Sequence, residues 1–127
     1  MSIKIRAIAR KNPRDLEAAP KYYAQKVNQG DVSLTELSEI IAQMSTVSKT
    51  DVFAVLMGLT EVIPRELASG KIIRLGTIGS FSVAVSSNPV DTEEEVSSHQ
   101  VRKLKLNFRP DAELKQKVEG FQVTKSS

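Results

Sequence analysis

Residues 70–83 carry the sequence GKIIRLGTIGSFSV, in which the apolar side chains begin to recur at every second position. The run from Lys71 to Leu75 predicts a short strand, and the run from Gly76 to Gly79 predicts a turn with two flexible positions. From Phe81 onward apolar residues alternate with small ones, which predicts a second strand. We therefore expect two strands joined by a tight turn.

A third strand is predicted further along the chain. Leu104, Leu106 and Phe108 alternate there with two lysines and an asparagine. Asn88-Pro89 ends the second strand. Residues 90–100 contain the acidic run Asp91-Thr92-Glu93-Glu94-Glu95, so we expect an exposed loop or hairpin tip between the last two strands. A short helix through Leu114 and Val118, ended by Gly120, is expected after the sheet.

Two helices are predicted before the sheet. Ser33-Leu34-Thr35-Glu36 is a capping box, and apolar residues at helical spacing continue to about residue 45. A second cap at Ser48 starts a longer apolar stripe that ends at Ser69-Gly70. Pro64 lies inside this second helix and removes a backbone donor, so we expect a kink or a break there.

The second helix is apolar on more than one side. Phe53, Ala54, Met57 and Gly58 leave little polar surface away from the main stripe. Such a helix must be covered on more than one side, which a short chain with one other clear helix cannot achieve alone. The pattern therefore favours a homodimer.

The two ends of the chain are predicted to hold short strands. Ile3, Ile5 and Ala7 indicate a strand in an ordered extension with one or two strands, and residues 121–123 indicate a terminal strand that pairs with it. The predicted organisation is a basic N-terminal extension over residues 1–30, one domain over 31–120 and a tail over 121–127. The predicted fold class is α+β, with two helices packed under a three-stranded antiparallel sheet.

Charge is distributed unevenly along a chain whose net charge is +3. Residues 1–30 contain seven basic and two acidic residues, whereas residues 31–70 contain two basic and six acidic ones. The chain has no cysteine, and its sequence predicts neither a secretory signal nor a membrane helix. We expect a cytoplasmic protein with a polarised surface that suits an anionic partner.

The outward face of the predicted sheet is the first candidate site. If the apolar residues face the helices, pleating places Ser82, Asn107, Lys103 and Lys105 on the opposite face. Small residues allow a phosphate backbone to approach, and lysines neutralise it. An ordinary solvated sheet face is the competing interpretation at this point.

Two motifs in this order resemble the HU/integration-host-factor family of bacterial histone-like proteins. Residues 70–83 look like the family's strand–turn–strand signature, and residues 107–115, NFRPDAELK, are similar to its Phe-Lys-Pro-Gly-x-x-Leu-Lys motif. The resemblance covers residues 33–118, and the basic extension resembles longer HU-like variants. It implies an IHF-like fold with a β-arm, an intertwined homodimer and a saddle that holds double-stranded DNA.

The resemblance implies a nucleoid-associated protein that binds duplex DNA through its backbone, with little sequence preference and no enzymatic activity. No cofactor and no metal are expected, because the sequence holds no phosphate-binding loop, metal-ligand cluster or catalytic arrangement around His99. RNA or single-stranded DNA remains open as the ligand. The candidate DNA contacts are Lys103, Lys105, Arg74, Arg109, Ser82, Asn107, Arg102, Lys4, Arg6, Arg10 and Lys11.

The arm departs from the family pattern. The family's tip reads Arg-Asn-Pro-x-x-Gly, whereas residues 87–92 read SNPVDT and lack both the arginine and the glycine. We therefore assign no intercalating residue. The acids at 91–95 would repel phosphate, so the alternative is an HU-like dimeric interaction module that engages a protein partner through its acidic arm, with weak or no DNA binding.

Overall fold

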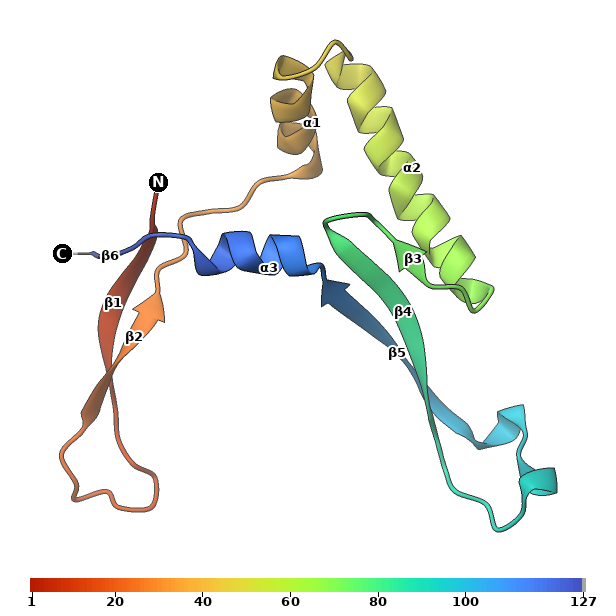
Figure 1. Cartoon of the computed structure of the whole chain (residues 1–127). Coiled ribbons are helices and arrows are strands. Elements are labelled where there is room, and N and C mark those ends of the chain that lie inside the picture. The colour runs from red at the N-terminus through yellow and green to blue at the C-terminus, as the bar shows by residue number, and fades with distance from the viewer. Residues whose placement is uncertain (127) are drawn as a thin grey trace. The chain divides into compact units, whose positions relative to one another are not determined.

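The computed structural model describes residues 1–126, which divide into two compact units. The terminal unit comprises Met1–Asp31 and the segment from Lys117 onward, and the central unit comprises Val32–Gln116. The described residues form a mixed α+β structure (Figure 1). Its helices and strands are β1 (Ile3–Arg10), β2 (Lys21–Lys26), α1 (Leu34–Gln43), α2 (Lys49–Ala68), β3 (Ile73–Arg74), β4 (Gly79–Ser87), β5 (Val101–Pro110), α3 (Ala112–Glu119) and β6 (Val123–Lys125).

The starts of α1 and α2 confirm the predicted caps. The Ser33 hydroxyl oxygen accepts a hydrogen bond from the backbone N–H of Glu36 at 3.2 Å, and Ser48 accepts one from Asp51 at 3.2 Å. Each bond satisfies one of the backbone donors that a helix start leaves unpaired. The Glu36 carboxylate accepts from the Ser33 hydroxyl at 3.3 Å instead of from a backbone donor, so the capping box is half formed.

Pro64 does not break α2. The helix runs without interruption from Lys49 to Ala68, so of the predicted kink or break the break does not occur. Proline removes a single backbone hydrogen bond, and the residues that follow it, Arg65 to Ala68, favour helix strongly. The helix ends with the backbone N–H of Gly70 donating to the carbonyl of Leu67 at 3.0 Å.

The sheet of the central unit has the strand order β3-β4-β5 and is antiparallel. Strand β3 contains only two residues and is shorter than predicted. The turn that follows is closed by the N–H of Leu75, which donates to the carbonyl of Gly79 at 2.8 Å. Gly76 and Gly79 have φ angles of +55° and +151°, which confirms two positions that need glycine.

The pairing of β4 with β5 confirms the two faces predicted for the sheet. Phe81 lies opposite Phe108, with ring centroids 4.9 Å apart, and Val83 lies opposite Leu106. Because side chains alternate between faces, these residues share one apolar face and their neighbours share the other. The register shifts between Ser86 and Ser87, which marks a bulge near the end of the pairing.

The helices do not cover the whole apolar face of this sheet. Helix α2 contacts β3 and β4, but Leu104, in the outer part of β5, is 66% exposed, and Val85 and Leu106 are also exposed. The prediction that two helices cover this face is therefore wrong for its outer half, because β4 and β5 continue beyond α2 as an arm (Figure 1). Among the described residues, Val52 is the one buried hydrophobic residue.

Hydrogen bonds between Asn88 and Gln100 join the two strands at the outer end of the arm, and we call this pair of residues the neck. The backbone N–H of Asn88 donates to the carbonyl of Gln100 at 3.0 Å, and the Gln100 side chain returns a bond to the Asn88 carbonyl at 2.8 Å. Two short 3-10 turns, Glu93–Glu95 and Ser98–Gln100, fill the segment beyond this neck. The acidic run is thus held at the end of the arm.

The terminal unit contains a second sheet, of order β2-β1-β6. Strand β1 pairs antiparallel with β2 and parallel with β6, with Ile3 opposite Val123. This confirms the strands predicted in the extension and the pairing of a terminal strand with the first one, but β6 lies at Val123–Lys125 and shares only Val123 with the predicted strand over residues 121–123. Val123–Lys125, within the segment predicted as a tail, thus form β6 in a sheet with strands of the N-terminal extension.

Candidate nucleic-acid interface

One face of the β3-β4-β5 sheet gathers basic side chains, and we call it the basic face. On the central strand β4, every second residue is small: Ser80, Ser82, Ala84 and Ser86. The cross-strand partners of these residues are, in order, Arg109, Asn107, Lys105 and Lys103 on β5. On the other side of β4, Arg74 of β3 lies opposite Ser80. The register therefore brings six sequence-predicted contacts, Arg74, Ser82, Lys103, Lys105, Asn107 and Arg109, onto a single face.

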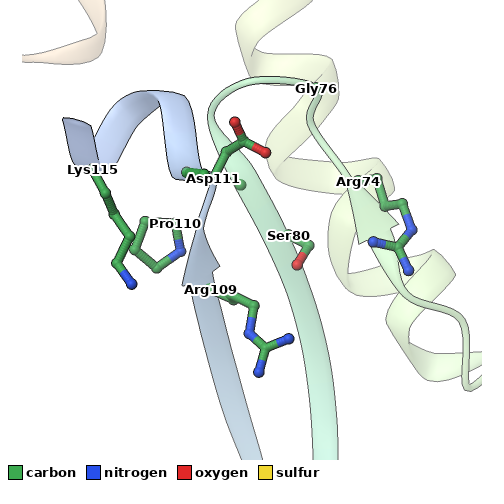
Figure 2. A pocket seen from close by; sticks show the side chains of 9 residues that line it. Arg74, Gly76, Ser80, Arg109, Pro110, Asp111 and Lys115 are labelled. Carbon is green, nitrogen blue, oxygen red and sulfur yellow. The ribbon is translucent and has the colours of Figure 1, made fainter. Parts of the chain in front are cut away.

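The inner end of the basic face is a row of three residues across three strands. Ser80 lies between Arg74 and Arg109, and Figure 2 shows its small side chain between the two guanidinium groups. Because the side chain of the central serine is short, an extended anion can approach both arginines together. Guanidinium forks are well suited to phosphate oxygens.

The bulge near the outer end of β5 adds another predicted contact. Ser87 pairs with Val101 and Ser86 pairs with Lys103, which leaves Arg102 without a cross-strand partner residue. The Arg102 Nη2 donates to the Ser86 hydroxyl at 3.4 Å. Because Ser86 belongs to the basic face, the guanidinium of Arg102 reaches that face although its strand position alternates with Lys103.

The cations of the basic face are not neutralised by the described part of the chain. Within residues 1–126, no carboxylate oxygen lies within 4 Å of the side-chain nitrogens of Arg74, Lys103, Lys105 or Arg109. The ion pairs of the central unit lie elsewhere, as in Lys49 with Glu39 at 2.7 Å. The positive charge of the face is therefore available to an external anion.

A cavity of about 630 Å³ opens at the inner end of the basic face. Its lining includes Arg74, Ser80, Arg109 and Lys115, the last from α3 (Figure 2). Sequence reasoning missed Ser80 and Lys115. Ser80 is in phase with Ser82, so the alternation of β4 was a sufficient signal for it. Lys115 is the last residue of the motif at 107–115, but a linear motif does not show that it lines the same cavity as Arg109.

Asp111 also lines this cavity and has a structural role. Its carboxylate accepts a hydrogen bond from the backbone N–H of Glu113 at 3.0 Å, so it caps the start of α3. A carboxylate here opposes the binding of an anion at the same helix end.

The remaining predicted contacts lie in the terminal unit. Lys4, Arg6 and Arg10 share one face of β1, and Lys11 follows that strand directly. They belong to a different compact unit from the basic face and form a group of their own.

The family model described as "HU domain fused to wHTH, Ig, or Glycine-rich motif", HU-HIG, matches residues 1–125. The chain belongs to the HU-HIG family. This confirms the resemblance to HU that the motifs at 70–83 and 107–115 predicted. The match also takes in the terminal unit of this HU-HIG chain, which lies outside the segment that carried the resemblance.

A solved structure also resembles this HU-HIG chain. It is that of a "Putative bacterial DNA binding protein" from Bacteroides vulgatus ATCC 8482, with a TM-score of 0.66 and 9% sequence identity. The likeness covers 98% of the HU-HIG chain but 48% of the other, so this chain spans about half the length of that protein. At this identity the likeness shows a shared fold. No curated protein matches the sequence.

In the part of the chain that the structure describes, no helix combines the length and apolar character needed to cross a membrane. Over the same residues no cluster of three or more histidine or acidic side chains is placed to hold a metal ion.

Proposed function

We propose that this HU-HIG chain binds double-stranded DNA through the phosphate backbone, with little sequence preference, as a nucleoid-associated protein of the bacterial cytoplasm. The observation that carries the proposal is the register of β3, β4 and β5, which gathers Arg74, Arg109, Lys105 and Lys103 on one face with no acid among them. Cations that meet phosphates release counterions, which supplies affinity independent of base sequence.

The residues between these cations favour contact with the backbone over reading of bases. Ser82 and Ser86 offer short hydroxyl groups, and Ala84 offers no polar group at all. Asn107 is the one amide on this face in the described structure, and bidentate amide contacts to adenine are a form of base readout. A single amide among four cations supports binding that tolerates most sequences.

The proposed binding unit is a homodimer with an IHF-like arrangement. Each chain leaves apolar side chains of α2 and of the inward sheet face exposed, among them Phe53, Val55 and Leu106. Exposed apolar surface of this extent in a small unit marks an interface. The resemblance to HU supports a partner of the same kind, whose sheet would extend the basic face into a saddle.

The proposed role is binding and not catalysis. The basic face holds cations, hydroxyl groups and an amide, but no carboxylate or imidazole that could exchange a proton near neutral pH. The single histidine, His99, lies in the second turn of the arm. We propose no cofactor and no metal.

A specific observation favours a second candidate, a protein-interaction module. The arm holds Asp91, Glu93, Glu94 and Glu95 in exposed positions beyond the neck formed by Asn88 and Gln100. Such a cluster repels phosphate and suits a basic protein surface. In this alternative the HU-like dimer engages a protein through the arm, and its DNA binding is weak or absent.

The proposal is tested by fluorescence anisotropy with a generic duplex of about 30 base pairs at two salt concentrations. We expect salt-sensitive binding that Lys103→Glu with Lys105→Glu weakens equally for unrelated sequences. Removing one cation that neutralises a phosphate should reduce the slope of log affinity against log salt by about 0.9.

The matched control reverses two charges on α2, Lys49→Glu with Arg65→Glu. It changes the net charge by the same amount at surface positions whose ion pairs contribute little to stability. A larger loss in the β5 variant than in this control supports the basic face. Equal affinity of the β5 variant and the unaltered protein would remove that face from the proposal, and a well-folded protein that binds no duplex at low salt favours the interaction module.

A further inference from the structure

We propose that the sheet of the terminal unit carries a second, separate binding surface whose ligand is single-stranded nucleic acid. The surface is the face that holds Lys4, Arg6, Ile8 and Arg10 of β1, and we call it the N-terminal face. The antiparallel register adds three residues of β2: Gln25 opposite Arg6, Tyr23 opposite Ile8 and Lys21 opposite Arg10. The proposal is independent of the basic face on the central unit.

The N-terminal face is strongly cationic. It carries two arginines and two lysines, and no acidic residue of β1 or β2 shares it, since neither strand contains one. Arg6 is held at its centre, because the Gln25 side-chain oxygen accepts from its Nε at 3.3 Å and from its Nη2 at 3.2 Å. A positioned guanidinium with free N–H groups remaining suits a phosphate.

The N-terminal face differs from the basic face in having an exposed aromatic ring. Tyr23 is 51% exposed, and the guanidinium carbon of Arg10 lies 5.8 Å from its ring centroid. The basic face has no aromatic residue among its alternating positions. Bases in a duplex already stack on each other, whereas an unpaired base gains from stacking on an aromatic ring. A ring among four cations therefore fits a single strand better than a duplex.

The end of the face is hollowed around the same side chains. A cavity of about 480 Å³ is lined by Arg10, Lys11, Pro13, Lys21 and Tyr23, among others. Its size falls within the roughly 300–1,000 Å³ typical of small-ligand sites. It provides room for an unstacked base beside Tyr23, with three cations placed for the adjoining phosphates.

The opposite face of the same strands supplies matched controls. Tyr22 is adjacent to Tyr23 and 71% exposed, but pleating directs it to the other side, with Ala24 and Lys26. A substitution at Tyr22 therefore removes a ring that is more exposed than Tyr23 but lies on the opposite face, and Lys26→Gln removes a charge from that face in the same way.

The test uses the full chain with Lys103→Glu and Lys105→Glu in place, so that duplex binding by the basic face is weakened. The probe is a fluorescein-labelled oligodeoxythymidylate of about 12 nucleotides, within the range of single-strand site sizes, which forms no duplex and is titrated at low salt. We expect this protein to retain binding. Tyr23→Ala should weaken it about tenfold, Tyr23→Phe should preserve it because the ring remains, and Tyr22→Ala should leave it unchanged.

A second comparison uses charges: Lys21→Gln, on the N-terminal face, should weaken binding more than Lys26→Gln, on the opposite face. Circular dichroism checks that each variant is folded. If Tyr23→Ala fails to fold, the two lysine variants decide between the faces. The proposal is overturned if the starting protein does not bind the oligonucleotide, or if substitutions on the two faces weaken binding equally. Failure of this proposal would leave the proposed binding of duplex DNA unaffected, because duplex binding is tested separately through Lys103 and Lys105 on the basic face.

Discussion

Gly79 shows how one residue positions the candidate interface. Its φ is +151°, and a Cβ built there would overlap the carbonyl oxygen of Arg109 and lie 2.8 Å from the ring of Phe108. The absence of a side chain thus lets β4 approach β5 where Arg109 enters the basic face. The sequence predicted that positions 76 and 79 need glycine, but the close approach to Arg109 depends on cross-strand register and could not be predicted from a local pattern.

We expect Gly79→Ala to destabilise the fold by about 3 kcal/mol or more, because the backbone strain adds to an overlap with main-chain atoms that cannot rotate away. Gly76→Ala is the control: its φ is +55°, nothing lies within 4 Å of the added carbon, and the expected cost is about 1 kcal/mol. Urea unfolding followed by circular dichroism measures both. Equal costs would show that strain alone, and not contact with β5, requires the glycine.

At the scale of elements, alternation predicted which residues share a face, and pairing between strands decided the rest. The lysines at 103 and 105 and the asparagine at 107 were placed correctly because a regular strand has a fixed period of two. Arg102 reaches the basic face only through the bulge, and a bulge leaves no reliable signal in one strand's sequence. Pro64 shows that a local signal can also mislead. A proline inside a helix predicts a kink or a break, but α2 continues through it because the residues that follow favour helix.

The arm permits a prediction at the same scale. Changing Glu93, Glu94 and Glu95 together to glutamine should tighten duplex binding by about two- to tenfold at low salt, because like charges near a phosphate backbone oppose binding and salt screens them. Anisotropy titration at two salt concentrations measures the change. Changing Glu39, Glu61 and Glu66 of α1 and α2 together to glutamine controls for the same change of three charges, because the ion pairs of Glu39 and Glu66 lie at the surface and contribute little to stability. Unchanged affinity at low salt would mean that the arm does not approach DNA and would favour the interaction module.

At the scale of the whole molecule, one chain lacks a sufficient core. Helices α1 and α2 pack together and α2 contacts the sheet, yet Val52 is the one buried hydrophobic residue in the described structure. The sequence indicated this through a second helix that is apolar on more than one side. It could not identify what covers these apolar side chains, because a pattern along one chain does not specify contacts made outside it.

A homodimer should have twice the 14.0 kDa of the chain in light scattering, and its unfolding midpoint should rise with protein concentration.

Val55→Lys tests the interface directly. Val55 is 66% exposed in one chain, so a lysine there would change a monomer's stability by less than about 0.5 kcal/mol. In a dimer that covers this helix the charge is buried, and we expect dissociation or unfolding. Glu61→Lys, at a polar position of the same helix, should leave the dimer intact. A Val55→Lys protein that stays dimeric with an unchanged midpoint would exclude this side of α2 from the interface.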